Sequence, residues 1–458
     1  MSEPSCWSGQ ASPHRLAEAL SVLLPLLPLE ARARAACVCR AWRAATSHPA
    51  LWEELSFERF ALRVNDATLS QLCARAGAAL RTLTLDSDAC KRTAFRDGFF
   101  TPNGLLAALR DGGCTGLRRL NLPVSKVWFE REQELTAEVA QELAAACPAL
   151  QHAACEVHCS LSEAVAVSTE LPGPLTLHCQ GDNCLDDSHG DFMQLAECMR
   201  DKANVVSLKL LSSHVGNAGA AQLAECLRVN AVLTSLDLED SGIEPAGAMQ
   251  LAECLRVNAT LKSLSLKDNF LGEAAATQLA ESLRVNATLT SLNLACTAIG
   301  AAGAMRLIEC LRVNATLTSL NLRRAGIAAE GTARLAACLR INTTLRSLDL
   351  TENNIGAAGA TQLADSLRVN ASLTRLNLRE TEMGIEGTTQ LALCLRVNTT
   401  LTYLDLSGNY VDQETLVESM RSNTTLRGLE LKDCGLGDYN DYAVELLREA
   451  CPRCTFYM

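Results

Sequence analysis

The sequence predicts an α/β solenoid, a horseshoe with parallel strands inside and helices outside. The stretch "LRVNATLTSLNL" begins at Leu283 and recurs unchanged at Leu311. Near-copies, always 28 residues apart, begin at Leu227, Leu255, Leu339, Leu367 and Leu395. Aromatic residues make up only 4% of the chain, so leucine and alanine must form the core. Repeats of this kind stack, so the 458 residues need not divide into several globular domains.

Residues 291–318 show how one repeat is built. In "SLNL", Leu292 and Leu294 alternate with polar residues, which is the period of a short strand. The apolar stripe of a helix follows: Ala304, Leu307, Ile308 and Leu311. Asn314 closes this helix, and we expect it there because asparagine tolerates a left-handed turn. Helices need more lateral room than strands, so the stacked array must curve with its strands inside.

The regular array extends to the end of the chain. Nine strands are expected at positions 207, 235, 263, 291, 319, 347, 375, 403 and 428. The last step is shorter, and "ELLREACPRCTFYM" is interpreted as a C-terminal cap. The stretch "LKSLSLKDNFL" from Leu261 resembles the leucine-rich-repeat consensus. With a helix in each 28-residue unit, the array resembles the ribonuclease-inhibitor-like class.

Four stretches upstream are interpreted as irregular repeats: "ALRTLTLDSDAC" (79–90), "GLRRLNLP" (116–123), "CPALQHAACEV" (147–157) and "PLTLHCQGDNC" (174–184). The phrase "CPAL" before a strand resembles the cysteine-containing repeats of F-box/leucine-rich-repeat proteins. The predicted division of the chain is a disordered tail at 1–14, a helical module at 15–57, irregular repeats at 58–190, and regular repeats with the cap at 191–458.

Residues 15–57 have no counterpart in the repeats, and their apolar residues are spaced as short helices. "VCRAW", followed by "LW" within "HPALWEELSF", resembles the second half of an F-box. The first half departs from that family, because Leu16 and Glu18 are kept while the usual proline between them is absent. A three-helix F-box-like module is therefore expected here.

This resemblance implies a function. F-boxes dock onto the Skp adaptor of a cullin–RING ubiquitin ligase, and the repeats then hold a protein substrate. Carried over by position, the adaptor-binding and packing set is Leu16, Glu18, Leu20, Leu23, Leu24, Leu27, Val38, Trp42, Leu51 and Trp52. The alternative is a binding or inhibitory horseshoe, like the ribonuclease inhibitors, whose N-terminal helices only cap the array.

Substrate contacts are expected where repeats differ on the inner face. The position after each second strand leucine varies while the leucines do not, and strand alternation turns it inward. The candidate substrate-binding residues are Glu239, Lys267, Arg323, Arg324, Arg375, Arg379 and Tyr403. The arginines suggest an acidic or phosphorylated partner. Drift among solvent-exposed positions is the alternative explanation of the variability.

Charge and cysteine content indicate which partners and which cellular location to expect for this protein. The net charge of −11, with both signs interspersed, argues against nucleic acid as a partner. The longest apolar run, Leu20 to Leu29, is too short for a membrane helix and lacks a preceding basic cluster. Six of the 21 cysteines share one helix position and are expected to be buried free thiols: Cys198, Cys226, Cys254, Cys310, Cys338 and Cys394. A cytoplasmic or nuclear location is therefore expected, and the Asn-x-Thr/Ser sites should not carry glycans.

Residues 152–189 hold four histidines and four cysteines, which raises the question of a zinc site: His152, Cys155, His158, Cys159, His178, Cys179, Cys184 and His189. Their spacings do not reproduce paired C-x2-C knuckles, so no metal or other cofactor is expected. Neither a phosphate-binding glycine loop nor a nucleophile–base arrangement is found, and no catalytic residue is proposed.

Overall fold

The computed structural model describes residues 49–56, 66–84, 102–122, 137–149, 155–159, 161–170, 174–180, 188–201, 204–211, 213–436 and 440–457. The predicted tail and most of the predicted helical module lie outside these ranges. The chain divides into two compact units, Met1–Cys179 and Gln180–Met458. We describe each unit by itself, and the predicted boundary at 190 stays a prediction.

Unit 1 alternates short strands and helices, as expected for irregular repeats. Its strands are β1 (Glu54–Ser56), β2 (Thr82–Thr84), β3 (Arg119–Leu122), β4 (Cys155–Cys159) and β5 (Leu175–Gln180). Its helices are η2 (Pro49–Trp52), α4 (Asp66–Ala76), η3 (Gly77–Ala79), α6 (Pro102–Asp111), α7 (Ala137–Ala146) and α8 (Leu161–Glu170). Each strand pairs in parallel with the next. The sheet begins at β1, so Glu54–Ser56, near the end of the predicted F-box-like module, form a strand that pairs with β2.

Unit 2 contains the regular repeats. Its strands are β6 (Val205–Leu211), β7 (Ser235–Asp237), β8 (Ser263–Ser265), β9 (Ser291–Asn293), β10 (Ser319–Asn321), β11 (Ser347–Asp349), β12 (Arg375–Asn377), β13 (Tyr403–Asp405), β14 (Gly428–Glu430) and β15 (Thr455–Tyr457). The nine expected strands are confirmed. The segment interpreted as a cap contributes a tenth, β15, which pairs in parallel with β14.

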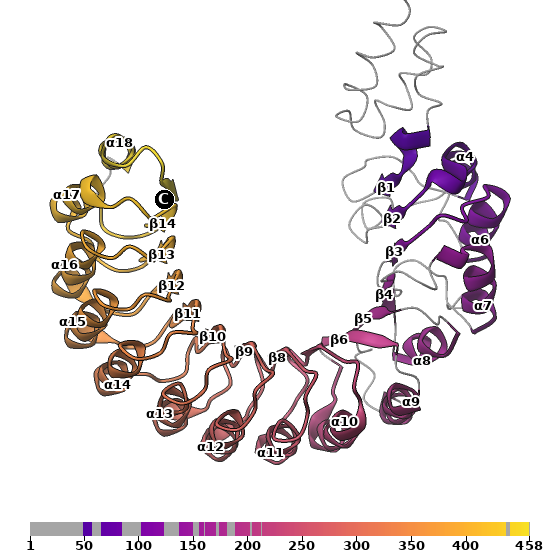
Figure 1. The fold of residues 1–458 in the computed structure, drawn as a ribbon, viewed down its shortest axis with the longest axis horizontal. Coiled ribbons are helices and arrows are strands. Elements are labelled where there is room, and N and C mark those ends of the chain that lie inside the picture. Colours follow the sequence, from indigo (N-terminus) through magenta and orange to yellow (C-terminus); the bar gives the residue numbers. More distant parts are fainter. Residues whose placement is uncertain are drawn as a thin grey trace, which may run out of the picture. The chain divides into compact units, whose positions relative to one another are not determined.

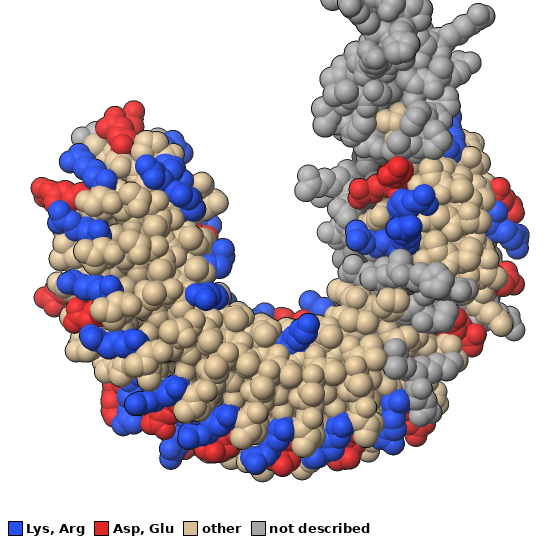
Figure 2. All heavy atoms as spheres, viewed as in Figure 1, with Lys and Arg blue, Asp and Glu red and all other residues tan. Residues whose placement is uncertain are grey.

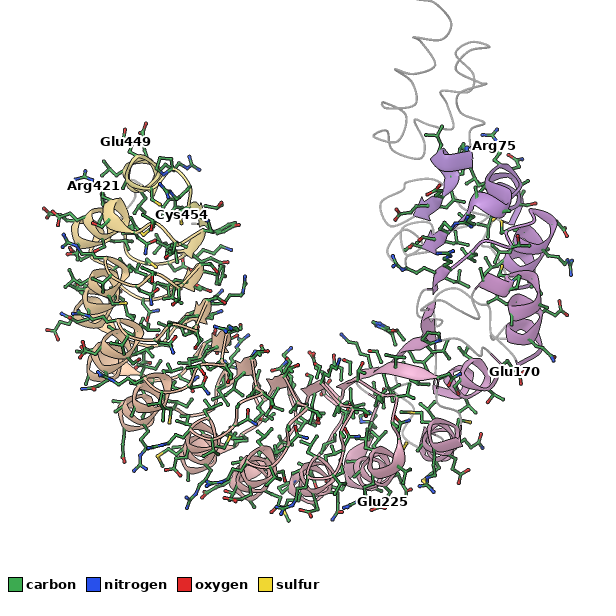
Figure 3. All side chains as sticks on the ribbon, viewed as in Figure 1. Arg75, Glu170, Glu225, Arg421, Glu449 and Cys454 are labelled. Atoms are coloured by element: carbon green, nitrogen blue, oxygen red, sulfur yellow. The ribbon has the colours of Figure 1, made fainter. Side chains whose placement is uncertain are left out.

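The helices of unit 2 cover the outer side of its curved sheet, so the predicted layers are confirmed (Figure 1). They are α9 (Ser188–Asp201), α10 (Gly216–Val229), α11 (Pro245–Cys254), α12 (Gly272–Leu283), α13 (Gly300–Cys310), α14 (Ala329–Leu339), α15 (Gly356–Leu367), α16 (Gly384–Leu395), α17 (Gln413–Ser422) and α18 (Asn440–Ala450). Glu225 and Arg421 lie on this outer surface (Figure 3). None of the helices described has the length and apolar character needed to cross a membrane.

The core of unit 2 lies between the sheet and the helices. The strand residues Leu292 and Leu294 and the helix residues Leu307 and Leu311 are all buried, as the sequence predicts. Neighbouring repeats meet in register, so Leu292 lies beside its counterparts in β8 and β10. A continuous leucine core therefore replaces the separate cores of globular domains.

An asparagine follows each helix of the regular array and is buried. The set is Asn230, Asn258, Asn286, Asn314, Asn342, Asn370, Asn398 and Asn423. In Asn286, the side-chain oxygen accepts hydrogen bonds from the main-chain N–H groups of Thr288 (3.1 Å) and Leu289 (2.8 Å). The left-handed conformation expected for these residues is wrong. Asn230 and Asn423 are extended, with φ of −69° and −73°, and none of the eight has a positive φ.

Positive φ angles fall instead on the inner side of the turn that follows each strand. The non-glycine residues at this position are Asp240, Asp268, Cys296, Arg324, Glu352, Glu380 and Asp433, with φ between 51° and 56°. Their residue types differ widely, so residue type at this position does not indicate the conformation. Arg324 and Glu352 both lie at this position of their turns, each with a φ of 55°.

The helix cysteines of unit 2 are free and mostly buried. Cys226, Cys254, Cys310, Cys338 and Cys394 are buried, while Cys198 is half-buried. Burial raises the pKa of the Cys254, Cys310 and Cys394 thiols to about 12, so all three are protonated at neutral pH. These thiols act as small apolar groups between helices.

Candidate functional site

The inner face of unit 2 is made by the side chains that alternate with the buried strand leucines. Six serines occupy one register position in consecutive strands, and we call them the serine row: Ser207, Ser235, Ser263, Ser291, Ser319 and Ser347. The same position continues as Arg375, Tyr403 and Gly428 in the next three strands. This register position is thus small and polar over β6–β11 and changes in chemistry from β12 onward.

The position after the second strand leucine is less uniformly exposed than expected. Glu239, Lys267, Arg323 and Arg379 reach solvent, with Arg379 the most exposed of the four. Ala295, Thr351 and Ser407, at the same position in other repeats, are buried. Among these residues, the position therefore reaches solvent only where its side chain is long.

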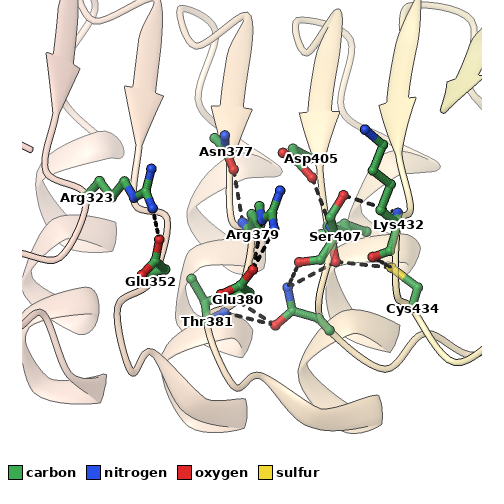
Figure 4. Close-up of polar contacts among 12 residues, drawn as sticks. Arg323, Glu352, Asn377, Arg379, Glu380, Thr381, Asp405, Ser407, Lys432 and Cys434 are labelled. Atoms are coloured by element: carbon green, nitrogen blue, oxygen red, sulfur yellow. Dashed lines mark hydrogen bonds and ion pairs between the residues drawn. The ribbon is translucent and has the colours of Figure 1, made fainter. Parts of the chain in front are cut away.

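Arg323 and Arg324 share one carboxylate. Both guanidinium groups form ion pairs with Glu352, whose side chain is only 16% exposed. Figure 4 shows the pair that Glu352 forms with Arg323. Glu352 stands one repeat beyond Arg324, at the same position of its own turn, and both residues have a φ of 55°. Aligning the repeats could therefore have suggested this pair. Only one of the two positive charges remains uncompensated.

The other charged candidates are paired too. Arg379 Nη2 lies 2.8 Å from Glu380 Oε1 (Figure 4). Lys267 Nζ lies 2.6 Å from Glu239 Oε1 and 3.3 Å from Asp268 Oδ2, and the hydrogen bond to Glu239 raises the lysine pKa. The predicted cationic patch is thus largely neutralised within the chain, so an anionic partner would have to compete with these carboxylates.

Arg375 and Tyr403 are held together differently. The Arg375 guanidinium carbon lies 4.3 Å from the centroid of the Tyr403 ring, a cation–π contact. The Tyr403 hydroxyl donates a hydrogen bond of 2.5 Å to Glu430 Oε1. Burial, followed by this bond, raises the pKa of Tyr403, which therefore stays neutral at physiological pH. The structure brings these two candidates into contact but separates them from Glu239 and Lys267, five and four strands before β12 along the sheet.

Two members of the predicted adaptor-binding set lie in the described part of the chain. Leu51 and Trp52, in η2, are buried, and η2 contacts α4. The Arg75 guanidinium lies 5.9 Å from the Trp52 ring centroid. Trp52 is 0% exposed, which favours a packing role. The other eight members, Leu16, Glu18, Leu20, Leu23, Leu24, Leu27, Val38 and Trp42, lie outside the described residues.

The histidine and cysteine residues considered as metal ligands are partly described. β4 and β5 pair so that His158 stands beside His178 and Cys159 beside Cys179. His152 and Cys184 lie outside the described ranges, as do the side chains of Cys155, His158, Cys159 and His189. Among the groups that the structure does describe, three or more potential ligands are nowhere gathered around a metal position.

Comparison with protein families assigns both parts of the chain. An F-box-like family model matches residues 18–58. A leucine-rich-repeat model matches 229–252, 285–307, 313–336, 342–364 and 397–413. The chain thus holds an F-box-like segment followed by leucine-rich repeats. Both resemblances drawn from the sequence are thus confirmed.

Other comparisons add little to this assignment. A search of curated protein sequences found no match for the F-box-like leucine-rich-repeat chain. Among solved structures, it is similar to leiomodin-1 actin-binding site 2, with 20% sequence identity and a TM-score of 0.29. That match covers 33% of this chain and 87% of the other. The functional argument below therefore rests on the family matches and on the geometry of this chain.

Proposed function

We propose that this protein is the substrate-recognition subunit of a Skp–cullin–F-box ubiquitin ligase. One observation carries the proposal: an F-box-like segment at 18–58 is followed in the same chain by leucine-rich repeats, matched between 229 and 413. F-box domains generally bind Skp-type adaptors, and leucine-rich repeats bind protein targets. Both are typically non-catalytic modules, so the protein would position a substrate for a separate ubiquitin-conjugating enzyme.

The inner face of unit 2 is the proposed substrate surface. It is wide and regular in the serine row, and its chemistry changes from β12 onward, where Arg375, Arg379 and Tyr403 lie. Arginine and tyrosine are enriched at the energetic centres of protein interfaces. Because Arg323 and Arg324 share the carboxylate of Glu352, we expect them to contribute less to binding than their number suggests.

Adaptor binding is tested by co-expressing the full chain with a Skp adaptor and measuring co-purification. Leu24→Asp, in the F-box-like segment, should abolish binding, since a charge there would oppose an apolar contact. The matched control is Val285→Asp, which introduces the same charge at an exposed position of unit 2. Trp52→Ala is unsuitable, because the buried ring of Trp52 packs against unit 1 and its loss would disturb the first repeats.

The results separate the two functions considered. Binding by the wild type and by Val285→Asp, with loss in Leu24→Asp, supports the ligase role. Equal binding by all three chains contradicts docking through the F-box-like segment. A wild type that does not bind the adaptor favours a binding scaffold whose N-terminal segment caps the array. The burial of Leu51 and Trp52 and the pairing of β1 with β2 support that second function.

A further inference from the structure

The serine row ends where the inner face acquires a fixed aromatic ring. After Ser347 in β11, the same register position holds Arg375 in β12, Tyr403 in β13 and Gly428 in β14. Six successive strands before this point keep serine, so the change is confined to a short part of the array. These three residues lie side by side on neighbouring strands and act together.

Gly428 leaves room for the Tyr403 ring. A Cβ atom placed at residue 428 would lie 3.0 Å from Tyr403 Cδ2, closer than ordinary van der Waals contact. On the far side of the same point, Tyr457 Cε2 of β15 lies 3.9 Å away. The hydroxyl of Tyr403 is bound to Glu430 at 2.5 Å. The ring is therefore fixed at its tip and along its side before any partner binds.

Arg375 rests on this ring and keeps its hydrogen-bond donors free. Its side chain is exposed, and its guanidinium carbon lies 4.3 Å from the ring centroid. Within the described part of unit 2, neither an ion pair nor a side-chain hydrogen bond engages Arg375, whereas Glu352 binds Arg323 and Glu380 binds Arg379. A stacked guanidinium presents its N–H edge outward and loses little flexibility when it binds.

We propose that Arg375, held over the Tyr403 ring, binds the carboxylate of an aspartate or glutamate side chain within an extended segment of the partner protein. The planar guanidinium can donate two parallel hydrogen bonds to such a group. This inference deepens the proposed function by naming what the substrate surface recognises, and it rests on that function for the identity of the partner as a substrate.

The surrounding charges favour a carboxylate over a phosphate. Glu430 is bound to the hydroxyl of Tyr403, and the buried Asp405 follows Tyr403 by two residues. Arg379 is already paired with Glu380. A single guanidinium in this setting can balance one negative charge, while a phosphate carries nearly two and would be repelled by the neighbouring carboxylates.

The position of Arg375 favours an internal side chain over a chain terminus. The serine row continues on one side of it, and Tyr403, Gly428 and Thr455 continue the same register position on the other. A bound segment that crosses the strands can therefore extend past Arg375 in both directions. The small serine side chains would let its backbone approach the sheet closely.

The test uses the full chain and a display library of random 12-residue peptides. A selected peptide is then synthesised in four forms. The first is the original sequence, the second has glutamine in place of its acidic residue, and the third has phosphoserine there. In the fourth, the only carboxylate is that of a free C-terminus. We expect selected peptides to contain an internal aspartate or glutamate. The glutamine form and the protein variant Arg375→Gln should each weaken binding by about tenfold or more.

Matched variants assign the effect to the stacked arginine. Arg306→Gln removes an arginine of helix α13 that is paired with Glu309, and binding should change by less than about twofold. Arg375→Lys keeps the charge but not the planar donors and should weaken binding by several-fold. Tyr403→Phe keeps the ring and should bind more tightly than Tyr403→Leu. Combining Arg375→Gln with the glutamine peptide should add little further loss.

Several results would overturn the inference. They are unchanged affinity in Arg375→Gln, tighter binding of the phosphoserine form, binding that needs a free C-terminus, or a selection that yields no acidic peptide. Adaptor co-purification, measured in parallel on Arg375→Gln, should match the wild type. A carboxylate site in a chain that never binds the adaptor would leave this inference standing and contradict the ligase role. Adaptor binding without recognition of a carboxylate would contradict this inference and leave the ligase role standing.

Discussion

Asn286 and Leu255, 31 positions apart, are joined by a hydrogen bond of 2.7 Å from the side-chain amide to the main-chain carbonyl. The same bond recurs through the array, for example from Asn314 to Leu283 and from Asn342 to Leu311. Each asparagine thus fastens its own turn to the end of the preceding helix. Buried in this way, it is not available for glycosylation in the folded protein.

Replacing this asparagine should destabilise the array. Asn286→Ala would leave the Leu255 carbonyl and the N–H groups of Thr288 and Leu289 without their partner in a buried place. We expect a loss of about 1–3 kcal/mol in the free energy of unfolding. Urea denaturation followed by circular dichroism would measure it. The matched control is Val285→Ala, at a position just before Asn286 that is 57% exposed, and an equal loss in both variants would contradict this role.

Core and surface aliphatic residues of one repeat should differ sharply in their effect. Leu307→Ala removes a buried side chain between helix and sheet and should cost about 2–5 kcal/mol. Val313, in the same repeat, is 55% exposed, so Val313→Ala should change stability by less than about 0.5 kcal/mol. Hydrogen exchange resolved along the chain would show the loss in adjoining repeats. Similar protection in both variants would mean that the leucine core is not continuous.

Asp405 should make stability depend on pH. Burial raises the pKa of its carboxyl above the ordinary value of 3.8, so the folded chain binds this proton more tightly than the unfolded chain does. The resulting stability is fully present below pH 3.8 and is lost as the pH rises through the folded-state pKa. Asp405→Asn should therefore flatten the pH profile and be more stable than the wild type at pH 7.

The repeats supply both the reason and the control for this substitution. Asp405 Oδ1 accepts a hydrogen bond of 2.9 Å from the main-chain N–H of Ser407, two residues later. In β9, β10 and β12 the residue equivalent to Asp405 is an asparagine, whose side-chain oxygen accepts the equivalent main-chain hydrogen bond. The control is Asp349→Asn, at the same position in β11. Denaturation between pH 4 and 7 would contradict the prediction if Asp405→Asn retained the wild-type slope.

Thiol reactivity should follow burial. Cys254, Cys310 and Cys394 are buried with a pKa of about 12, so they should resist alkylation of the folded protein at pH 8. Cys198 and Cys296, which are half-buried, should react before these three. Peptide mapping after iodoacetamide treatment would show the order. Rapid labelling of Cys310 without denaturant would contradict the packing of the helix layer.

The sequence was sufficient for the parts of the fold that repetition determines. Residues equivalent to Leu292, Leu307 and Asn314 recur in the other regular repeats. The burial and secondary structure predicted for one unit therefore apply to the others. The conformation of Asn314 was wrongly predicted because residue type indicates which turns are tolerated but not which one packing selects. β15 was missed, since "TFY" has no leucine pattern and forms a strand only beside β14.

The candidate site was predicted less completely than the fold. Strand alternation identified Arg323, Arg375 and Tyr403 as candidates, but it could not show which of them were already engaged. Whether an arginine meets a carboxylate, as Arg323 meets Glu352, depends on side-chain direction across a left-handed turn. The stacking of Arg375 on Tyr403 likewise depends on the glycine at 428, whose importance appears only when strands are placed side by side.

The hydrogen bonds from each asparagine back to the preceding helix give the array a direction of growth. A ribosome releases the chain from its N-terminus, so Leu255 emerges well before the Asn286 amide that will cap its carbonyl. The carbonyl at the end of each helix therefore gains this hydrogen bond only after the next repeat has been synthesised. While the chain grows, the last helix made always lacks it. Asn423, bonded back to Leu395, supplies the last such closure, so a chain that stopped just before it would keep its final carbonyl open.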